Sequence, residues 1–387
     1  IRWVLAFTTT AAAVLLYSLS YEISRRAWFS LLSPLLYVAA IPVYLGRFAA
    51  GNIPYPVWYS VALWAAGLLC LLRFARGARL AWLFAAGLLA GVGFSFKPNV
   101  GLFQLAVSSM VVLSVCPLQA VGRPSWKVRL GTVCWWLWWF SVFGGLGLVF
   151  SGRAGPREVW ILCAPFLACG LLVAWRAAVV PPTEPVAGLY SSAVTLGLGF
   201  AVSVAPWLVY FYDLLGPQLF VQRVLFFGAN FEQFYFIAHP LVLTAFATLG
   251  AALLVVWWLP RRVAHYLPPG RVLLVLAVVA VPVGAAMITN RPMPEGFYAA
   301  VMSEFEAHAY ALALVAHWIG IWAWSRSIGT TPRHRDPSLV LTVTTLGAVG
   351  LYMQIYPRTD YMHWVTAAPV SIALGVGMLP WLADRWT

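Results

Sequence analysis

The sequence predicts an all-α fold, a polytopic transmembrane helical bundle with about 13 spans. Hydrophobic residues make up 62% of the 387 residues and charged residues only 9%, which is more apolar than a soluble domain tolerates. Apolar runs of about 20 residues, the length that crosses a bilayer as a helix, recur along the chain almost without gaps. The alternating segments of about 10 residues that a transmembrane β-barrel needs are absent, so backbone polar groups must be paired within helices.

Proline, glycine and charged residues divide the apolar runs into individual spans. The fourth and fifth spans are the hardest to separate, because only Lys97, Pro98 and Asn99 stand between them. The spans fill residues 1–387 as a single transmembrane domain, and the start at Ile1 without a Met predicts that the chain is a fragment. The predicted spans lie near residues 1–21, 28–46, 55–72, 80–96, 100–118, 130–150, 158–176, 189–212, 236–259, 271–289, 305–324, 338–356 and 365–383.

Loop charges predict the orientation of this bundle. Assigning the loops alternately to two faces places 16 Lys and Arg residues on one face and seven on the other, with Arg2 at the start set aside. Since Lys and Arg in short loops are retained in the cytoplasm, the poorer face is expected to be periplasmic or extracellular. We therefore expect a multi-pass protein of the inner (plasma) membrane. The net charge of +13 does not indicate a nucleic-acid partner, because the basic residues are scattered over short loops.

Several common sites are missing from the sequence. It contains no Gly-rich phosphate loop, nucleophile elbow, Cys/His zinc pattern or HExxH motif, so no catalytic residue and no metal ligand is assigned. The five cysteines mostly lie within apolar runs, and we interpret them as small core residues.

The most informative local string is Tyr356–Trp364, which packs three ionisable groups into six residues at the outer end of a predicted span. Arg358 is suited to pair with a phosphate, Asp360 to orient that arginine or bind a sugar hydroxyl, and His363 to donate to a diphosphate or shuttle a proton. The structural alternative is an Arg–Asp pair that caps the next helix, with the aromatic residues in the interfacial belt.

A second candidate is Lys97, with Asn99 beside it, in the longest apolar stretch of the chain. A charge at membrane depth costs about 2.5–3.5 kcal/mol on insertion scales, so such a lysine is a functional candidate for holding a lipid-linked phosphate. The alternative is a lysine that snorkels at a tight outer turn, with Pro98 and Asn99 as ordinary turn residues.

A third candidate is the pair Glu304 and His308, which are four residues apart and share a helix face. The pair has the chemistry to bind a sugar or a metal, but two ligands do not make a metal site. An acidic helix start favoured by the macrodipole explains the same residues. His317, deeper in the same span, is interpreted as a hydrogen-bonded packing residue rather than a proton relay.

Three segments together resemble the GT-C superfamily of multi-spanning glycosyltransferases, in particular its poorly characterised bacterial members. They are the opening Arg2–Trp3 helix that runs into Tyr21–Arg26, the Gly87–Gly91 helix that leads to Phe96–Gly101, and the late Pro357–His363 string. Their order and separation are also similar, so the resemblance covers nearly the whole chain and predicts a GT-C-like bundle.

The resemblance implies an outward-facing active site in which basic residues hold a lipid phosphate. The implied partners are a polyprenyl-phosphate sugar donor, a lipid or glycan acceptor and membrane lipids. It also implies a hexosyl or pentosyl transfer that inverts the anomeric carbon, with a carboxylate base in the first external loop. The chain begins at what would be the second helix of the family, so we expect this loop and its base to be missing here. Lys97, Arg358 and His363 would lie nearest the phosphate, and the sequence leaves a divalent metal ion open as a cofactor.

Other classes of function compete with a glycosyltransferase. The main alternative is a multi-spanning transporter or flippase for a lipid-linked or small polar substrate, which needs ionisable residues at mid-membrane depth. A polysaccharide polymerase or ligase and a purely structural membrane scaffold are further alternatives. The sequence does not identify the sugar or the acceptor.

Overall fold

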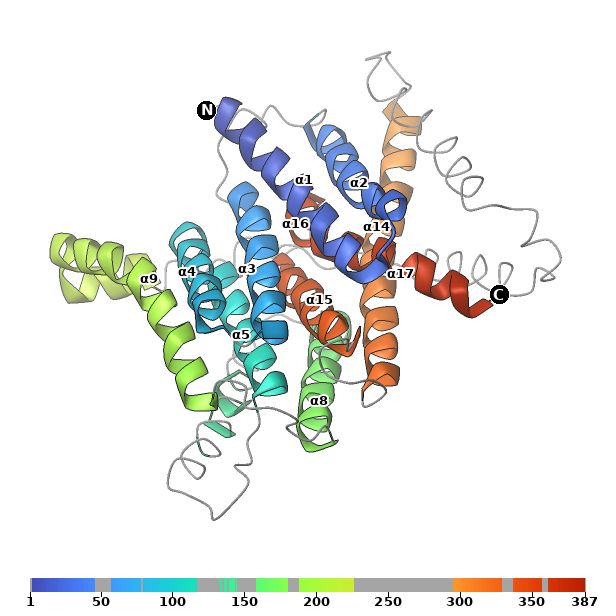
Figure 1. Ribbon diagram of the computed structural model, residues 1–387. Coiled ribbons are helices and arrows are strands. Elements are labelled where there is room, and N and C mark those ends of the chain that lie inside the picture. Colours follow the sequence, from blue (N-terminus) through green and yellow to red (C-terminus); the bar gives the residue numbers. More distant parts are fainter. Residues whose placement is uncertain are drawn as a thin grey trace.

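The computed structural model describes helices that come from most of the chain (Figure 1). It describes residues 2–45, 57–77, 79–116, 158–179, 188–225, 295–328, 337–356 and 361–386, with isolated helical positions between 133 and 144. Within these residues there is no strand, as predicted for an all-α fold. The helices are α1 (Arg2–Ser24), α2 (Ala27–Leu45), α3 (Val57–Gly77), α4 (Leu80–Phe96), α5 (Pro98–Val115), η2 (Val159–Cys163), α8 (Ala164–Val179), α9 (Leu189–Phe220), η3 (Val221–Leu225), α14 (Glu295–Ser327), α15 (Pro337–Tyr352), η5 (Met353–Ile355), α16 (Tyr361–Ala367) and α17 (Pro369–Trp386).

Five of the described helical segments are long and apolar enough to cross a membrane. Several other predicted spans coincide with shorter apolar helices, and those near 236–259 and 271–289 lie outside the described residues. The described part therefore supports a helical membrane protein without fixing the predicted number of spans. The five segments are Tyr59–Gly77, Pro98–Val115, Val159–Ala177, Leu189–Arg223 and Ser338–Ile355.

Helix α15 is the centre of the described bundle (Figure 1). Every side chain from Ser338 to Tyr356 is buried, and α3, α5, α8, α14 and α17 all pack against it. Its hydroxyl side chains are compatible with this position because they are bonded within the helix. Thr342 donates to the Ser338 carbonyl at 2.6 Å and Thr344 to the Val340 carbonyl at 2.7 Å. Such bonds to the preceding turn satisfy hydroxyls that would otherwise be costly to bury.

Contacts of α15 define the two ends of the bundle. The Trp64 indole N–H of α3 donates to the Gly347 carbonyl at 3.1 Å, and Gly350 lies against Val107 of α5. Because Gly350 also lies against Trp64 while Gly347 lies against Leu68, α15 runs antiparallel to α3. We call the end where α3 and α5 begin the Lys97 end, and the end where they finish the Arg76 end.

Helices α4 and α9 pack with their backbones in close contact. A Cβ atom at Gly87 would overlap the Leu196 carbonyl oxygen, and one at Gly91 would come within 2.6 Å of the Phe200 carbonyl oxygen. The Ser203 hydroxyl donates across the interface to the Leu88 carbonyl at 3.2 Å. Small residues four apart with an interhelical hydrogen bond are a common way to join helices in membranes, where apolar side chains gain little by leaving lipid.

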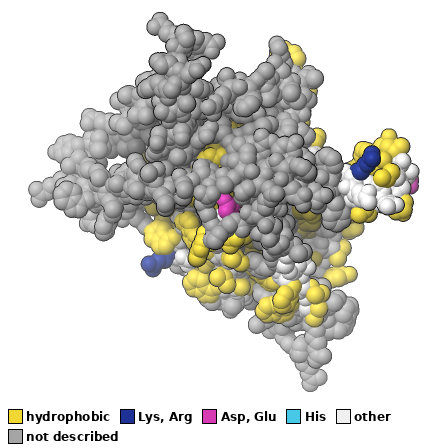
Figure 2. Space-filling view, turned by 180° about the vertical axis from the view of Figure 1, so that it is seen from behind, with side chains coloured by type: hydrophobic (Ala, Val, Ile, Leu, Met, Phe, Trp, Pro, Cys, Tyr) yellow, Lys and Arg dark blue, Asp and Glu magenta, His cyan; other side chains and the backbone are white. Residues whose placement is uncertain are grey.

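Helix α9 extends beyond the predicted span 189–212 and is interrupted near its end. Gly216 has φ 69°, a left-handed conformation that glycine adopts without a steric penalty, and Pro217 follows it. Apolar side chains along α9 are largely exposed, including Leu198, Val202 and Val209. The space-filling view from behind likewise shows that the described side chains on that face are mostly hydrophobic with few charges (Figure 2). Such surfaces are expected of helices that contact lipid.

A buried arginine joins three helices at the Arg76 end. Arg176 at the end of α8 is 3% exposed, and its guanidinium donates to the Ser114 carbonyl of α5 and to the Ser338 hydroxyl of α15. Arg176 is one of the 16 Lys and Arg residues assigned from the sequence to the loops of the Arg-rich face, whereas in the structure it lies inside the bundle. Two of its nitrogen atoms donate to oxygen acceptors on neighbouring helices, which offsets part of the cost of burying the charge.

Candidate functional site

Lys97 forms the junction between α4 and α5, at the boundary predicted as the hardest to separate. It has an extended backbone, with φ −151° and ψ 102°, so one helix ends at Phe96 and the next begins at Pro98. The Lys97 amide donates to the Gly93 carbonyl at 2.9 Å, and its own carbonyl accepts the amides of Val100 at 3.0 Å and Gly101 at 3.2 Å. The junction is therefore held by backbone hydrogen bonds, and the lysine side chain is half-buried at the start of α5.

The residues next to Lys97 have structural roles in the turn and in the packing of α3 against it. Pro98 occupies the first turn of α5, where its missing N–H costs nothing. The Asn99 side-chain oxygen accepts the Val100 amide at 3.0 Å, which matches the turn role considered for it. Phe96 stacks on Tyr59 of α3 with ring centroids 5.1 Å apart. A cation at the positive end of the α5 dipole, next to an aromatic pair, is a favourable place for an anion.

His363 lies at the same end of the bundle, on helix α16. It lies in the first turn of α16, is half-buried, and its carbonyl accepts the Thr366 hydroxyl at 2.9 Å. Helix α16 packs against α2, α3 and η5, and η5 packs against α5. Since α15 ends at the Lys97 end, the α16 segment that follows it lies at that end too. The structure thus brings two of the predicted basic residues to one end of the bundle. Arg358 and Asp360 lie outside the described residues.

The third predicted pair lies on helix α14. The α14 backbone is helical from Glu295, ten residues before the predicted span, so Glu304 and His308 do share a helix face. Their side chains lie outside what the structure describes. Close to them in sequence, Tyr310 of α14 packs against Trp364 of α16 with ring centroids 6.1 Å apart. This contact puts the α14 segment that carries the pair near the α16 segment that carries His363.

Two buried glutamines near the Lys97 end were not predicted. Gln104 is 2% exposed and donates to the Leu63 carbonyl at 3.2 Å, and Gln354 is 1% exposed and donates to the Thr366 carbonyl at 2.9 Å. Within the described residues, neither side-chain oxygen has a hydrogen-bond partner. A buried polar atom without a hydrogen-bond partner lowers the stability of the fold by about 1–3 kcal/mol, so these two oxygens are candidates for a functional role. In the sequence, each glutamine stands inside a long apolar run, and this pattern could have identified both as candidates.

His317 packs as predicted. It is 1% exposed, its Nε2 atom and the Ser371 hydroxyl are 2.8 Å apart, and its ring meets Tyr352 edge to face at 5.1 Å. These contacts link α14, α15 and α17, while the buried Nδ1 atom of His317 has no hydrogen-bond partner among the described residues.

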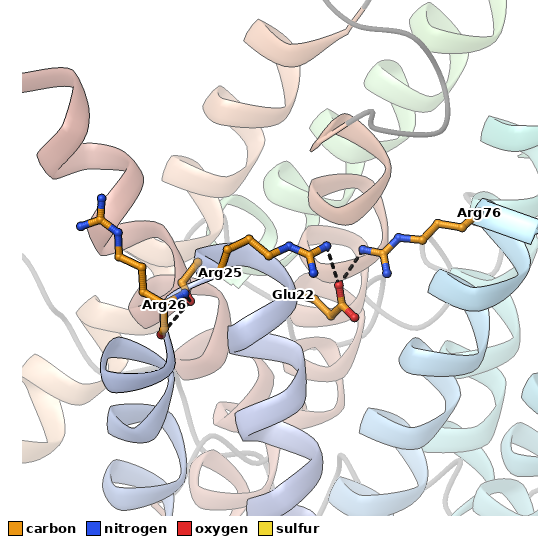
Figure 3. A network of polar contacts seen from close by, with 5 residues as sticks. Glu22, Arg25, Arg26 and Arg76 are labelled. Carbon is orange, nitrogen blue, oxygen red and sulfur yellow. Dashed lines mark hydrogen bonds and ion pairs between the residues drawn. The ribbon is translucent and has the colours of Figure 1, made fainter.

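The Arg76 end carries an ion-pair network that joins α1 to α3 (Figure 3). One Glu22 carboxylate oxygen accepts Arg76 at 2.6 Å and Arg25 at 2.8 Å, and the two guanidinium groups approach it from opposite sides. Burial alone would raise the pKa of Glu22, but the hydrogen bond and charge of Arg76, with the charges of Arg25 and Arg73, outweigh burial and lower it. Glu22 is therefore held in its ionised form.

Neither metal chemistry nor thiol chemistry has an assigned site in the described part of the chain. No group of three or more His, Cys, Asp and Glu side chains lies close enough there to hold a metal ion. Cys116 and Cys169 are buried and Cys70 and Cys163 are half-buried, as expected of small core residues. Cys134 lies outside the described residues.

No family model, no curated protein and no solved structure matches the chain.

Proposed function

We propose that this chain belongs to a membrane glycosyltransferase that moves a sugar from a polyprenyl-phosphate carrier to an acceptor on the outward face, with the Lys97 end as that face. The observation that carries the proposal is the placement of Lys97, at the start of α5, and of His363, on α16, at one end of a helical bundle. The likeness of the Phe96–Gly101 and Pro357–His363 strings to GT-C enzymes supports it. The Arg-rich loops assigned to the cytoplasm, including those of Arg25, Arg26 and Arg76, lie at the opposite end.

The proposed chemistry assigns the cations to the lipid phosphate. An acceptor hydroxyl attacks the anomeric carbon of the sugar, its proton passes to a general base, and the bond from that carbon to the phosphate oxygen breaks with its electron pair going to the phosphate. Negative charge grows on the departing phosphate, where the Lys97 ammonium and the α5 dipole stabilise it. We assign to His363 a hydrogen bond donated to the same phosphate group. The general base is not assigned to a described residue.

The same arrangement also suits binding without chemistry. Gln104 and Gln354 put polar amides inside the bundle, and each has an oxygen without a hydrogen-bond partner in the described structure. A transporter or flippase would use such groups to pass a polar headgroup between helices. The two functions differ in whether the bond between sugar and phosphate is broken.

The test uses the full-length protein in sealed proteoliposomes loaded with a radiolabelled polyprenyl-phosphate sugar. Covalent transfer or release of the sugar is expected from the wild type, and Lys97→Gln is expected to lower the rate by about 10²-fold, as when one donor to a developing oxyanion is removed. Arg326→Gln, an exposed arginine at the Arg76 end, is the control and should retain the wild-type rate. Movement of intact substrate across the bilayer would instead assign the chain to the transporters.

A further inference from the structure

The turn between α1 and α2 and the last turns of α3 carry more positive charge than their carboxylate neutralises. We call Glu22, Arg25, Arg26, Arg73 and Arg76 the arginine cluster; its four guanidinium groups and one carboxylate leave a net formal charge of +3. Two of the arginines bond to Glu22, and a third, on the exposed side of α3, acts on it through its charge. The fourth points away from Glu22 (Figure 3).

The backbone of the turn holds this cluster in place. Arg25 has φ 55°, a left-handed conformation that is unusual for a residue with a side chain, and its amide still donates to the Tyr21 carbonyl at 2.9 Å. The next amide, of Arg26, donates to the Ser24 hydroxyl at 3.1 Å. A hydroxyl-to-hydroxyl bond of 2.8 Å then joins Ser24 to Ser30 on α2. These hydrogen bonds fix the backbone that carries Arg25 and Arg26.

We propose that the arginine cluster binds the phosphate diester headgroup of an anionic phospholipid. The Arg25 side chain is 57% exposed and Arg73 is also exposed, so guanidinium donors face outward at the end of two helices. Guanidinium groups match the paired oxygens of a phosphate, and basic pockets between transmembrane helices commonly bind anionic headgroups. Trp28, 79% exposed beside the turn, is of the type that settles at the headgroup level of a bilayer.

Glu22 has a defined part in this binding site. By accepting Arg25 and Arg76 on one oxygen, it fixes two guanidinium groups while leaving the cluster cationic. This inference does not depend on the proposed glycosyltransferase function, because it concerns the opposite end of the bundle.

The test measures lipid binding by the full chain in nanodiscs made of phosphatidylcholine, with or without phosphatidylglycerol. Phosphatidylglycerol retained by the protein is counted by native mass spectrometry at several ionic strengths. The wild type should prefer phosphatidylglycerol, and Arg25→Gln and Arg73→Gln should each weaken that preference about fivefold, the contribution of one arginine near an anionic surface. Arg73→Lys should keep most of the preference because it keeps the charge. Arg326→Gln, exposed on α14 outside the cluster, is the matched control.

Three results would overturn the proposal. The first is a wild type without preference for phosphatidylglycerol, and the second is a loss of preference in Arg326→Gln as large as that in the cluster variants. The third is competition by inorganic phosphate as strong as that by phosphatidylglycerol, since the cluster would then select a free anion rather than a lipid. Circular dichroism of each variant must match the wild type, and Arg73→Lys serves as the folded reference if Arg73→Gln does not.

Discussion

The close contact between α4 and α9 can be tested by adding one methyl group. In Gly199→Ala, the new Cβ would overlap the Phe84 carbonyl oxygen and lie 3.0 Å from the Leu88 amide nitrogen. Both atoms belong to the backbone of α4, so no side-chain rotation relieves the overlap. The two helices must move apart, and contacts along their shared face are then weakened.

The expected magnitude follows from a control on the same helix. Gly197→Ala adds the same methyl group where no atom of another described helix lies within 4 Å. Both substitutions gain about 1 kcal/mol from the higher helix propensity of alanine. Only Gly199→Ala also overpacks the interface, which costs about 1–3 kcal/mol. The free energy of unfolding of Gly199→Ala should therefore be lower than that of Gly197→Ala by about 1–3 kcal/mol.

Unfolding by SDS in mixed micelles, followed by circular dichroism, measures this difference. The reasoning would be refuted if the two variants unfolded with free energies within about 0.5 kcal/mol of each other, because a surface substitution has an effect of that size.

Further predictions concern polar contacts inside the bundle. Glu22→Gln should lower the free energy of unfolding by about 1–2 kcal/mol near neutral pH. The pKa of Glu22 is lowered in the folded state, so the stabilisation by its ion pairs is complete above the usual carboxyl pKa. This stabilisation is lost as the pH falls through the lowered pKa. Unfolding at a series of pH values should show the gap between wild type and variant closing in acid, and a constant gap would count against the ion pairs. Trp64→Phe removes the bond to the Gly347 carbonyl and should cost about 1–2 kcal/mol, with unchanged stability as the contrary result. Gln104→Met removes one hydrogen bond together with an unpartnered buried oxygen, so its stability should stay within about 1 kcal/mol of the wild type, and a larger loss in the same unfolding assay would show an additional partner.

The sequence predicted local features of the fold better than it predicted helix partners. The junction at Lys97 could be located because Lys-Pro-Asn breaks an apolar run, and the structure places the helix boundary there. The spacing of Gly87 and Gly91 can be seen in the sequence. The α9 residues that these glycines contact lie more than 100 residues away, and no local pattern predicts them. Helix α9 is longer than the predicted span 189–212, and its break comes at Gly216.

For charged residues near helix ends, too, the sequence predicted the local position but not the partner. A lysine or arginine beside an apolar run predicts which face its loop occupies, but not whether its side chain meets water. Arg176 is buried because Ser114 and Ser338, distant in sequence, supply acceptors to it. The pairing of Glu22 with Arg76 likewise depends on α1 packing beside α3. In the candidate site, the structure describes the side chains of Lys97, Asn99 and His363. For Glu304 and His308 it describes only the helical backbone.

Crosslinking of a lipid phosphate tests the central claim most directly. A polyprenyl phosphate that carries a photoreactive group beside the phosphate is bound to the protein, irradiated, and its attachment sites are mapped by mass spectrometry. We predict labelling around Lys97 at the α4–α5 junction and around His363 on α16, removed by excess unlabelled polyprenyl phosphate and strongly reduced in Lys97→Gln but not in Arg326→Gln. Labelling that the unlabelled lipid does not displace, or that gathers at the Arg76 end, would contradict a polyprenyl-phosphate site at the Lys97 end.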